Sequence, residues 1–160
     1  MNIGYYLTHR FAIFALNVVL AVITFVTLWD ASLLLSDLIE NSAVIENLLE
    51  GVATIFVAYG VALEERDTLM KVFKLYPRLE SVRQEATDKL CHFYGLSYLL
   101  IGLFMEVTIE LVKLPYRILN DAKTENVIFF IGFLFCLIAI TLFVKNNYLL
   151  LKLPHQKTAE

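Results

Sequence analysis

The stretch that decides the fold is FAIFALNVVLAVITFVTL, from Phe11 to Leu28. Only Asn17, Thr24 and Thr27 among its eighteen residues are polar, and none is charged. A run of this length and polarity is long enough to cross the hydrocarbon core of a bilayer as an α-helix. Trp29 follows as an aromatic residue suited to the membrane interface. Because the run is long and no small-residue cleavage site follows it, we interpret it as a retained first helix and not as a signal peptide.

The composition of the whole chain also fits a membrane protein. Hydrophobic residues make up 59% of the 160 residues and charged residues 18%, with a mean hydropathy of +0.68. A soluble domain is typically about 45–50% apolar and about 25% charged. Such a chain would expose large apolar patches to water, so we expect the lipid bilayer to surround it. The net charge of −3 and the lack of a basic stripe give no indication of a nucleic-acid partner.

Three further apolar stretches complete the pattern. The sequence therefore predicts an all-α fold, a four-helix transmembrane bundle in a single integral membrane domain of residues 1–160. The spans are expected at about 11–28, 43–63, 93–114 and 127–144. The fourth, VIFFIGFLFCLIAITLFV, is apolar almost throughout, and Lys145 is expected to end it.

The basic residues predict the orientation of these spans. Four crossings place both termini and the loop of residues 64–92 on one side, which holds ten Lys and Arg residues, against three on the other side. The three are Lys113, Arg117 and Lys123. Because cytoplasmic loops carry the Lys and Arg excess, we expect a multi-pass cell-membrane protein with cytoplasmic N- and C-termini.

The long cytoplasmic loop is predicted to contain an amphipathic helical connector between the second and third spans. In DTLMKVFKLY, residues 67–76, apolar side chains recur at helical spacing and Lys71 and Lys74 lie on the other face. Pro77 interrupts the pattern, which then resumes and runs into the third span. The connector is either a packed linker on the membrane surface or a docking surface for a partner.

The second and third spans carry acidic residues at matching positions. Each has only thirteen consecutive uncharged residues, roughly 20 Å of helix against a hydrocarbon core of about 30 Å. To cross, the second must include Glu50 and Glu46, and the third Glu106 and Glu110. Glu50 and Glu106 each lie 14 residues from the cytoplasmic end of their helix, and Glu46 and Glu110 each lie 18 residues from it.

Two antiparallel helices would therefore bring the four carboxylates to equal depth. Each pair is spaced i, i+4 and lies on one helix face. Small residues that permit close helix approach share these stripes: Ala53 and Gly60 on the second span, Gly95 and Gly102 on the third. Buried together, four carboxylates could not all stay ionised. We expect a candidate site for protons or a hard divalent cation, whose preferred ligands are oxygen atoms.

A structural interpretation of the same acids is also open. Asn41 and Ser42 are typical N-cap residues, which would place Glu46 and Glu50 in the first turns of the helix, where the helix dipole favours acidic side chains. Glu106 and Glu110 would pair with Lys113, with Arg117 or with a partner chain. Thr24 of the first span is expected near the depth of Glu50, and Asp30, just beyond that span, near the depth of Glu46.

Other chemistry is less well supported. His9, His92 and His155 lie at or beyond the predicted cytoplasmic helix ends, so a haem held between two buried histidines is not expected. Cys91 and His92, with His9, form a weaker metal candidate. No Glu-x-x-His pair of di-iron proteins and no nucleophile, phosphate-loop or dinucleotide motif occurs in the sequence. We therefore expect no enzymatic activity.

The stretch LLEGVATIFVAYGVALEERDTL, from Leu48 to Leu69, resembles the second helix of small four-span proteins of the phosphate-starvation-inducible PsiE type. The resemblance covers about twenty residues and rests on Leu49-Glu50 and on Ala62-Leu63-Glu64. The third span lacks the arginine that this family would lead us to expect. The resemblance implies a four-span fold and no particular activity.

Two functions follow as hypotheses. The first is a non-enzymatic accessory or assembly subunit of a membrane complex, whose apolar helices face lipid or other membrane protein chains. The second is a homo-oligomeric proton or divalent-cation channel or transporter that uses Glu46, Glu50, Glu106 and Glu110.

Overall fold

The computed structural model describes residues 10–34, 38–72, 82–113 and 122–152. This part of the chain is helical apart from a turn at Glu65. Its five helices are α2 (Arg10–Leu34), α3 (Leu38–Glu64), α4 (Arg66–Val72), α5 (Val82–Lys113) and α6 (Ala122–Lys152). All but α4 are long and apolar enough to cross a membrane.

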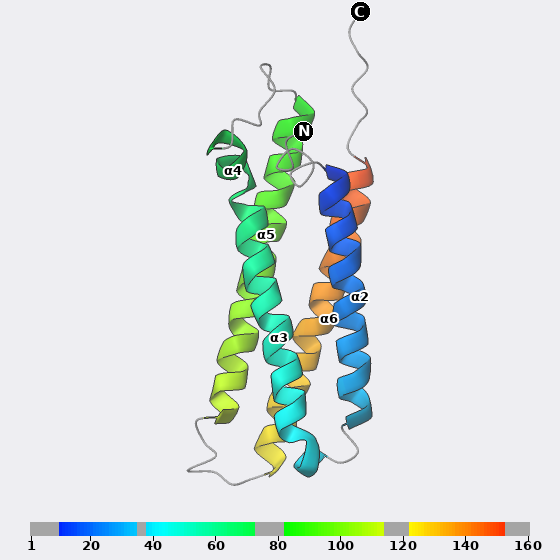
Figure 1. Cartoon of the computed structure of the whole chain (residues 1–160), viewed down its shortest axis with the longest axis vertical. Helices are drawn as coiled ribbons and strands as arrows, with labels where there is room; N and C mark the ends of the chain where they lie inside the picture. The colour runs from blue at the N-terminus through cyan, green and yellow to red at the C-terminus, as the bar shows by residue number, and fades with distance from the viewer. Residues whose placement is uncertain (1–9, 35–37, 73–81, 114–121, 153–160) are drawn as a thin grey trace, which may run out of the picture.

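The four long helices lie side by side, and helices that follow one another in sequence run in opposite directions (Figure 1). The start of α2, the end of α3, the start of α5 and the end of α6 lie together with α4 at one end of the molecule, here called the α4 end. The predicted connector between the second and third spans falls at this end.

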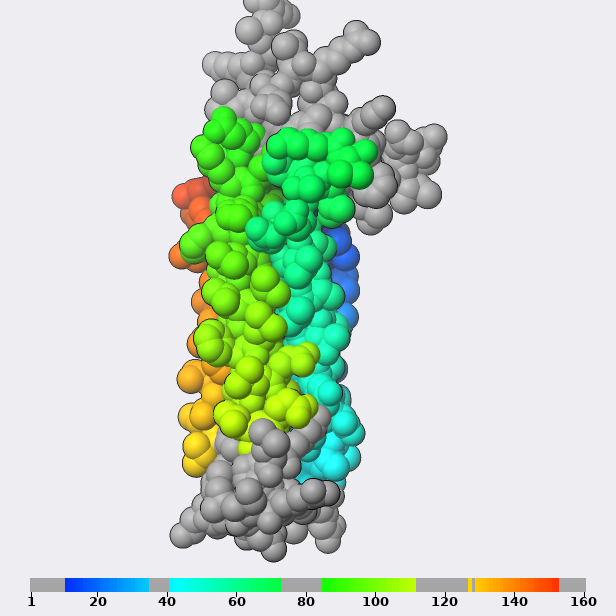
Figure 2. Space-filling model, turned by 90° about the vertical axis from the view of Figure 1, so that its left-hand side faces the viewer, coloured from blue at the N-terminus to red at the C-terminus, as the bar shows by residue number. Residues whose placement is uncertain are grey.

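Helices α3 and α5 form the closest pair, and they adjoin along the face that Figure 2 shows. Glycines make this approach possible. A Cβ on Gly60 would come within 2.5 Å of the backbone nitrogen of Leu99, and one on Gly102 within 2.8 Å of the backbone oxygen of Ala53. A Cβ on Gly95 would likewise meet the backbone of Glu64, and it would come within 2.8 Å of the backbone oxygen of Gly60. The predicted small-residue stripes therefore form the contact between these two helices.

The remaining contacts close the array around a shared core. Helix α6 packs against α2 and α5, and α2 packs less extensively against α3. The largest fully buried apolar side chains come from three helices: Ile45, Leu49 and Phe56 of α3, Tyr94, Tyr98 and Met105 of α5, and Phe129 and Phe143 of α6. The outward faces of α2, α5 and α6 carry many exposed large apolar residues, as expected where lipid is the solvent.

Helix α4 continues the backbone hydrogen bonding of α3. The Glu65 amide donates to the Val61 carbonyl at 3.0 Å, and the Leu69 amide donates to the Glu65 carbonyl at 2.9 Å. Met70 of α4 is buried, whereas Leu69 and Val72 are exposed. Residues 73–81, which hold Pro77 and the rest of the predicted connector, lie outside the described residues.

The helices extend beyond the predicted spans at both ends of the array. Helix α6 continues past Lys145 for seven residues to Lys152, because one exposed lysine, whose long side chain can reach toward the interface, does not end a helix. Helix α3 begins at Leu38, so Asn41 and Ser42 lie inside it and the N-cap interpretation is wrong. Leu114, the last residue of the third predicted span, lies outside the described residues.

Candidate functional site

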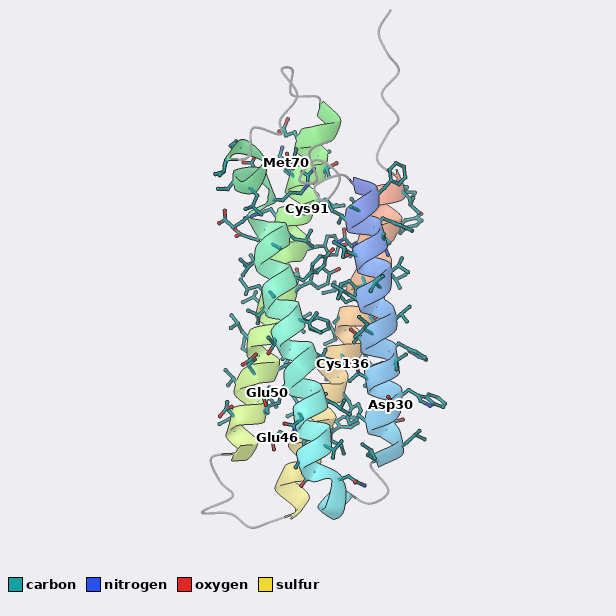
Figure 3. All side chains as sticks on the ribbon, viewed as in Figure 1. Asp30, Glu46, Glu50, Met70, Cys91 and Cys136 are labelled. Carbon is teal, nitrogen blue, oxygen red and sulfur yellow. The ribbon has the colours of Figure 1, made fainter. Side chains whose placement is uncertain are left out.

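The four predicted carboxylates lie on α3 and α5, in the half of the molecule away from α4. Glu46, Glu50 and Glu106 are half-buried, and Glu110 is exposed. Figure 3 shows Glu46 and Glu50 on the lower part of α3 and Asp30 on α2, well to the side of them. Asp30 is exposed and therefore does not join the interior of the helix array.

The register of α3 against α5 brings Thr54 beside Glu106, and Thr54 lies one turn of α3 away from Glu50, which the sequence predicts at the depth of Glu106. Leu99 lies opposite Gly60, and Val57 lies opposite Gly102. One turn beyond, the Thr54 hydroxyl donates a hydrogen bond to Oε1 of Glu106 at 3.0 Å. The acid stripes of the two helices thus run beside each other, and Thr54 is a partner of Glu106 that the sequence reasoning did not include.

These carboxylates do not form a ready-made metal centre in the structure. Among the described residues, no group of three or more His, Cys, Asp or Glu side chains could hold a metal ion. The predicted cation site therefore stays a prediction. The side chain of Lys113 and all of Arg117, the proposed cationic partners, lie outside what the structure describes.

The helix dipole gives little support to the structural interpretation of Glu46 and Glu50. Since α3 begins at Leu38, Glu46 lies in its third turn and Glu50 one turn later. The favourable effect of the dipole is confined to about the first turn of a helix. Glu46, Glu50 and Glu110 all make further polar interactions.

A second polar group, closer to the α4 end, joins three helices by hydrogen bonds. Asn17 of α2 is fully buried. Its Nδ2 donates to Oδ1 of Asn147 on α6 at 3.0 Å, and its Oδ1 accepts from the Tyr59 hydroxyl of α3 at 2.7 Å. Each polar atom of the Asn17 amide therefore has a partner on a different helix. Thr24, two turns further along α2, donates only to the Leu20 carbonyl of its own helix, at 2.8 Å.

Tyr98 of α5 and Asn146 of α6 bring the fourth long helix into this group. The Tyr98 ring stacks on Phe143 with centroids 4.5 Å apart, and Tyr59 lies 5.8 Å away. The Asn146 side chain lies beside the Tyr98 hydroxyl. The Tyr98 hydroxyl and both Nδ2 and Oδ1 of Asn146 are buried and have no hydrogen-bond partner. We call Asn17, Tyr59, Tyr98, Asn146 and Asn147 the polar layer.

Between the polar layer and α4 lies a buried ion pair. The guanidinium of Arg66, in the first turn of α4, pairs with the carboxylate of Asp88 on α5, and both side chains are largely buried. Cys91, one turn further along α5, is a buried free thiol. These contacts fix the short helix α4 against the start of α5.

Two members of the weaker metal candidate, Cys91 and His92, lie in different surroundings. The Cys91 side chain is buried, whereas His92 is exposed and its Nδ1 lies 3.3 Å from Oε1 of Glu64. His9, the third member, lies outside the described residues.

Sequence reasoning missed the polar layer because it ended the fourth span at Lys145. Asn146 and Asn147 then fell outside the membrane region, and Asn17 was only one polar residue in an apolar run. The available clue was the pattern of residues 148–151, YLLL, which continues the apolar character of the helix beyond the two asparagines.

Comparison of the chain with family models, with curated proteins and with solved structures finds no match. The likeness to PsiE-type proteins stays a resemblance over one helix.

Proposed function

We propose that this chain is a small multi-pass membrane protein that acts as a non-enzymatic accessory or assembly subunit. The four apolar helices support the membrane setting. The outward face of α3 is the observation that supports a role in assembly.

The outward face of α3 differs from the outward faces of the other long helices. On α2, α5 and α6 the exposed positions are mostly Val, Leu, Ile and Phe. The exposed residues of α3 include Val44, Ile55 and Val61, but one stripe of exposed positions is small or polar: Asn47, Gly51, Thr54, Ala58 and Ala62. We call this stripe the outer α3 face. A Cβ at Gly51 would meet no atom within 4 Å, so the backbone is open to the outside there.

Small residues matter in lipid because burial of apolar surface does not drive helices together there. Association depends on close packing and on interhelical hydrogen bonds, which small residues and Asn or Thr side chains provide. Helix α3 already uses this principle on its inner face, where Gly60 lets the backbone of α5 approach. The outer α3 face offers the same chemistry to a transmembrane helix of another chain.

The proposed orientation places the α4 end in the cytoplasm. It follows from the excess of Lys and Arg in the segments that this end joins. Helix α4 then lies at the cytoplasmic membrane surface as the connector, with Leu69 and Val72 exposed toward the lipid headgroups.

The test of this function adds bulk to the outer α3 face. In Gly51→Leu, Ala58→Leu, both new side chains point away from the rest of the chain. The matched control, Val22→Leu, Val26→Leu, adds bulk to the exposed face of α2. Each variant is purified gently from its native membrane, and co-purifying chains are identified by mass spectrometry.

We expect a stoichiometric partner chain with the wild type and with the α2 control, and its loss from the α3 variant. Unchanged thermal stability of the α3 variant shows that the fold is intact. A partner retained by the α3 variant, or a wild type that purifies as a monomer without partners, would contradict the proposal.

The second candidate function, a homo-oligomeric conductor of protons or divalent cations, rests on a different observation. The acid stripes of α3 and α5 run beside each other, and Thr54 provides Glu106 with a hydrogen-bond donor. In this function Glu46, Glu50, Glu106 and Glu110 would bind the ion. Four helices rarely enclose a pathway, so several copies of the chain would be required.

A further inference from the structure

We propose that Tyr98 and Asn146 bind a water molecule inside the helix array, and that this water completes the polar layer across all four long helices. This inference concerns a site distinct from the outer α3 face and does not rest on the proposed function.

The first argument is the number of unpaired atoms. The Tyr98 hydroxyl and the Nδ2 and Oδ1 atoms of Asn146 are buried without a hydrogen-bond partner. A buried polar group without a partner loses its bonds to water and gains nothing in return. Rotation of the two side chains into a direct hydrogen bond would pair the hydroxyl with one amide atom of Asn146. The other amide atom would stay unpaired, so a further group is needed.

The second argument is the chemistry that the site requires. Nδ2 of Asn146 is a donor, Oδ1 is an acceptor, and the Tyr98 hydroxyl is both. A ligand that satisfies all three atoms must both accept and donate hydrogen bonds. An anion or a metal cation would meet only one of these needs. A hydroxyl group both accepts and donates hydrogen bonds, and water is the smallest molecule that does the same.

The third argument is space. Tyr98 exposes 0% and Asn146 1% of its surface. On the Tyr98 side the rings of Phe143 and Tyr59 pack against the site. So tight an enclosure favours the smallest ligand, and buried waters in proteins typically make about three hydrogen bonds to groups of this kind.

The position of the site gives the water a structural role. Asn147, the neighbour of Asn146 on α6, reaches α2 and α3 through Asn17 and Tyr59 by direct hydrogen bonds. Asn146 faces α5. Two consecutive asparagines thus hold α6 to all three other long helices, one through direct contacts and one through water. Tyr98 lies six residues past the exposed His92 of α5, roughly 9 Å along the helix axis.

The test uses the full-length wild-type chain, isotopically labelled and reconstituted in lipid bilayers, with water-edited solid-state NMR. We expect magnetisation from water to reach the Asn146 side-chain amide and the Tyr98 ring. Transfer to the Asn17 amide, which is bonded directly to protein groups, is expected to be several-fold slower. Transfer to Asn146 no faster than to Asn17 would overturn the proposal.

A second experiment compares Tyr98→Phe, Asn146→Leu and the double variant. Tyr98→Phe removes one hydrogen-bond partner of the water, and Asn146→Leu removes the other two. In each single variant a buried polar group is left without a partner, so we expect the unfolding equilibrium constant to rise about tenfold. In the double variant no polar atom remains to hold water, so it should be no less stable than the worse single variant. Fully additive losses, or a wild-type spectrum that shows a direct bond between Tyr98 and Asn146 without water contact, would count against the site.

Discussion

A Cβ atom on Gly60 of α3 would lie 2.5 Å from the backbone nitrogen of Leu99 on α5. Because backbone atoms of a packed helix cannot turn aside, a side chain at residue 60 must push the two helices apart. We expect Gly60→Val to destabilise the protein by at least the roughly 1–3 kcal/mol that overpacking of a core costs. Reversible unfolding in mixed micelles would measure the loss.

Gly51 serves as the control for this substitution, since it lies in the same helix and a Cβ there meets no atom within 4 Å. Gly51→Ala should leave the free energy of unfolding unchanged or raise it slightly, because alanine favours the helix. Equal losses for Gly51→Ala and Gly60→Val would show that the close approach of α5 is not what makes Gly60 sensitive to an added side chain.

The hydrogen bonds of Asn17 give a second prediction. Asn17→Ala removes the partner of both Tyr59 and Asn147 at once. Interhelical hydrogen bonds in membranes contribute on average about 0.6 kcal/mol and at most about 1.7 kcal/mol, so a loss of about 1–2 kcal/mol is expected. Thr141→Val is the control, because the Thr141 hydroxyl donates only within its own helix, to the Leu137 carbonyl at 2.9 Å. A loss of similar size in both variants would argue against Asn17 as a link between helices.

A third prediction concerns the ion pair between Arg66 and Asp88. Its side chains are 6% and 16% exposed, so Asp88→Ala removes a carboxylate from a largely buried guanidinium. We expect a loss of about 3 kcal/mol or more. The control is Asp67→Ala, which removes the carboxylate from an exposed ion pair with Lys71. This substitution should lower the free energy of unfolding by no more than about 0.5 kcal/mol.

Helix α4 should be the element that responds to the loss of Asp88. Hydrogen exchange of the α4 amides is expected to accelerate in Asp88→Ala, while exchange in α2 and α6 stays unchanged. Slow exchange throughout α4 in this variant would show that Met70 alone is enough to hold the helix.

Replacement of Glu50 and Glu106 by glutamine separates the two candidate functions. For an ion conductor, the double variant should lose proton or cation flux in proteoliposomes while it still assembles. For an assembly subunit, the wild type should show no flux above protein-free vesicles, and partner capture should fall in the variant. Asp30→Asn is the control, since Asp30 is an exposed acid on a different helix and neither function uses it.

The four long helices were predictable from the sequence because long apolar runs are rare in soluble proteins and typical of membrane spans. The face on which α3 meets α5 was predictable too, since small residues at helical spacing mark close helix contacts. Equal depth of Glu50 and Glu106 was expected from counting residues in antiparallel helices, but in the structure Glu106 accepts a hydrogen bond from Thr54, one turn of α3 away from Glu50. Residue counts from the expected helix ends do not fix how two helices slide against each other.

The helix ends and the polar layer were not predictable in the same way. Lys145 looked like the end of a span because a charge is costly in lipid, yet its exposed side chain is compatible with a helix that continues to Lys152. Hydrogen bonds between Asn17 and Asn147 depend on how the first and last helices pack. No local pattern carries that information.

The two kinds of contact in this protein become possible at different times as the chain is made. The glycine contacts join α3 and α5, which follow each other in sequence, so these helices can form a hairpin before α6 has been synthesised. The bond between Asn17 and Asn147 joins the first long helix to the last, so it can form only when the whole chain has entered the membrane. A product that ends before α6 would leave Nδ2 of Asn17 without its Asn147 partner, an unmet polar group by which membrane quality control can recognise an unfinished molecule.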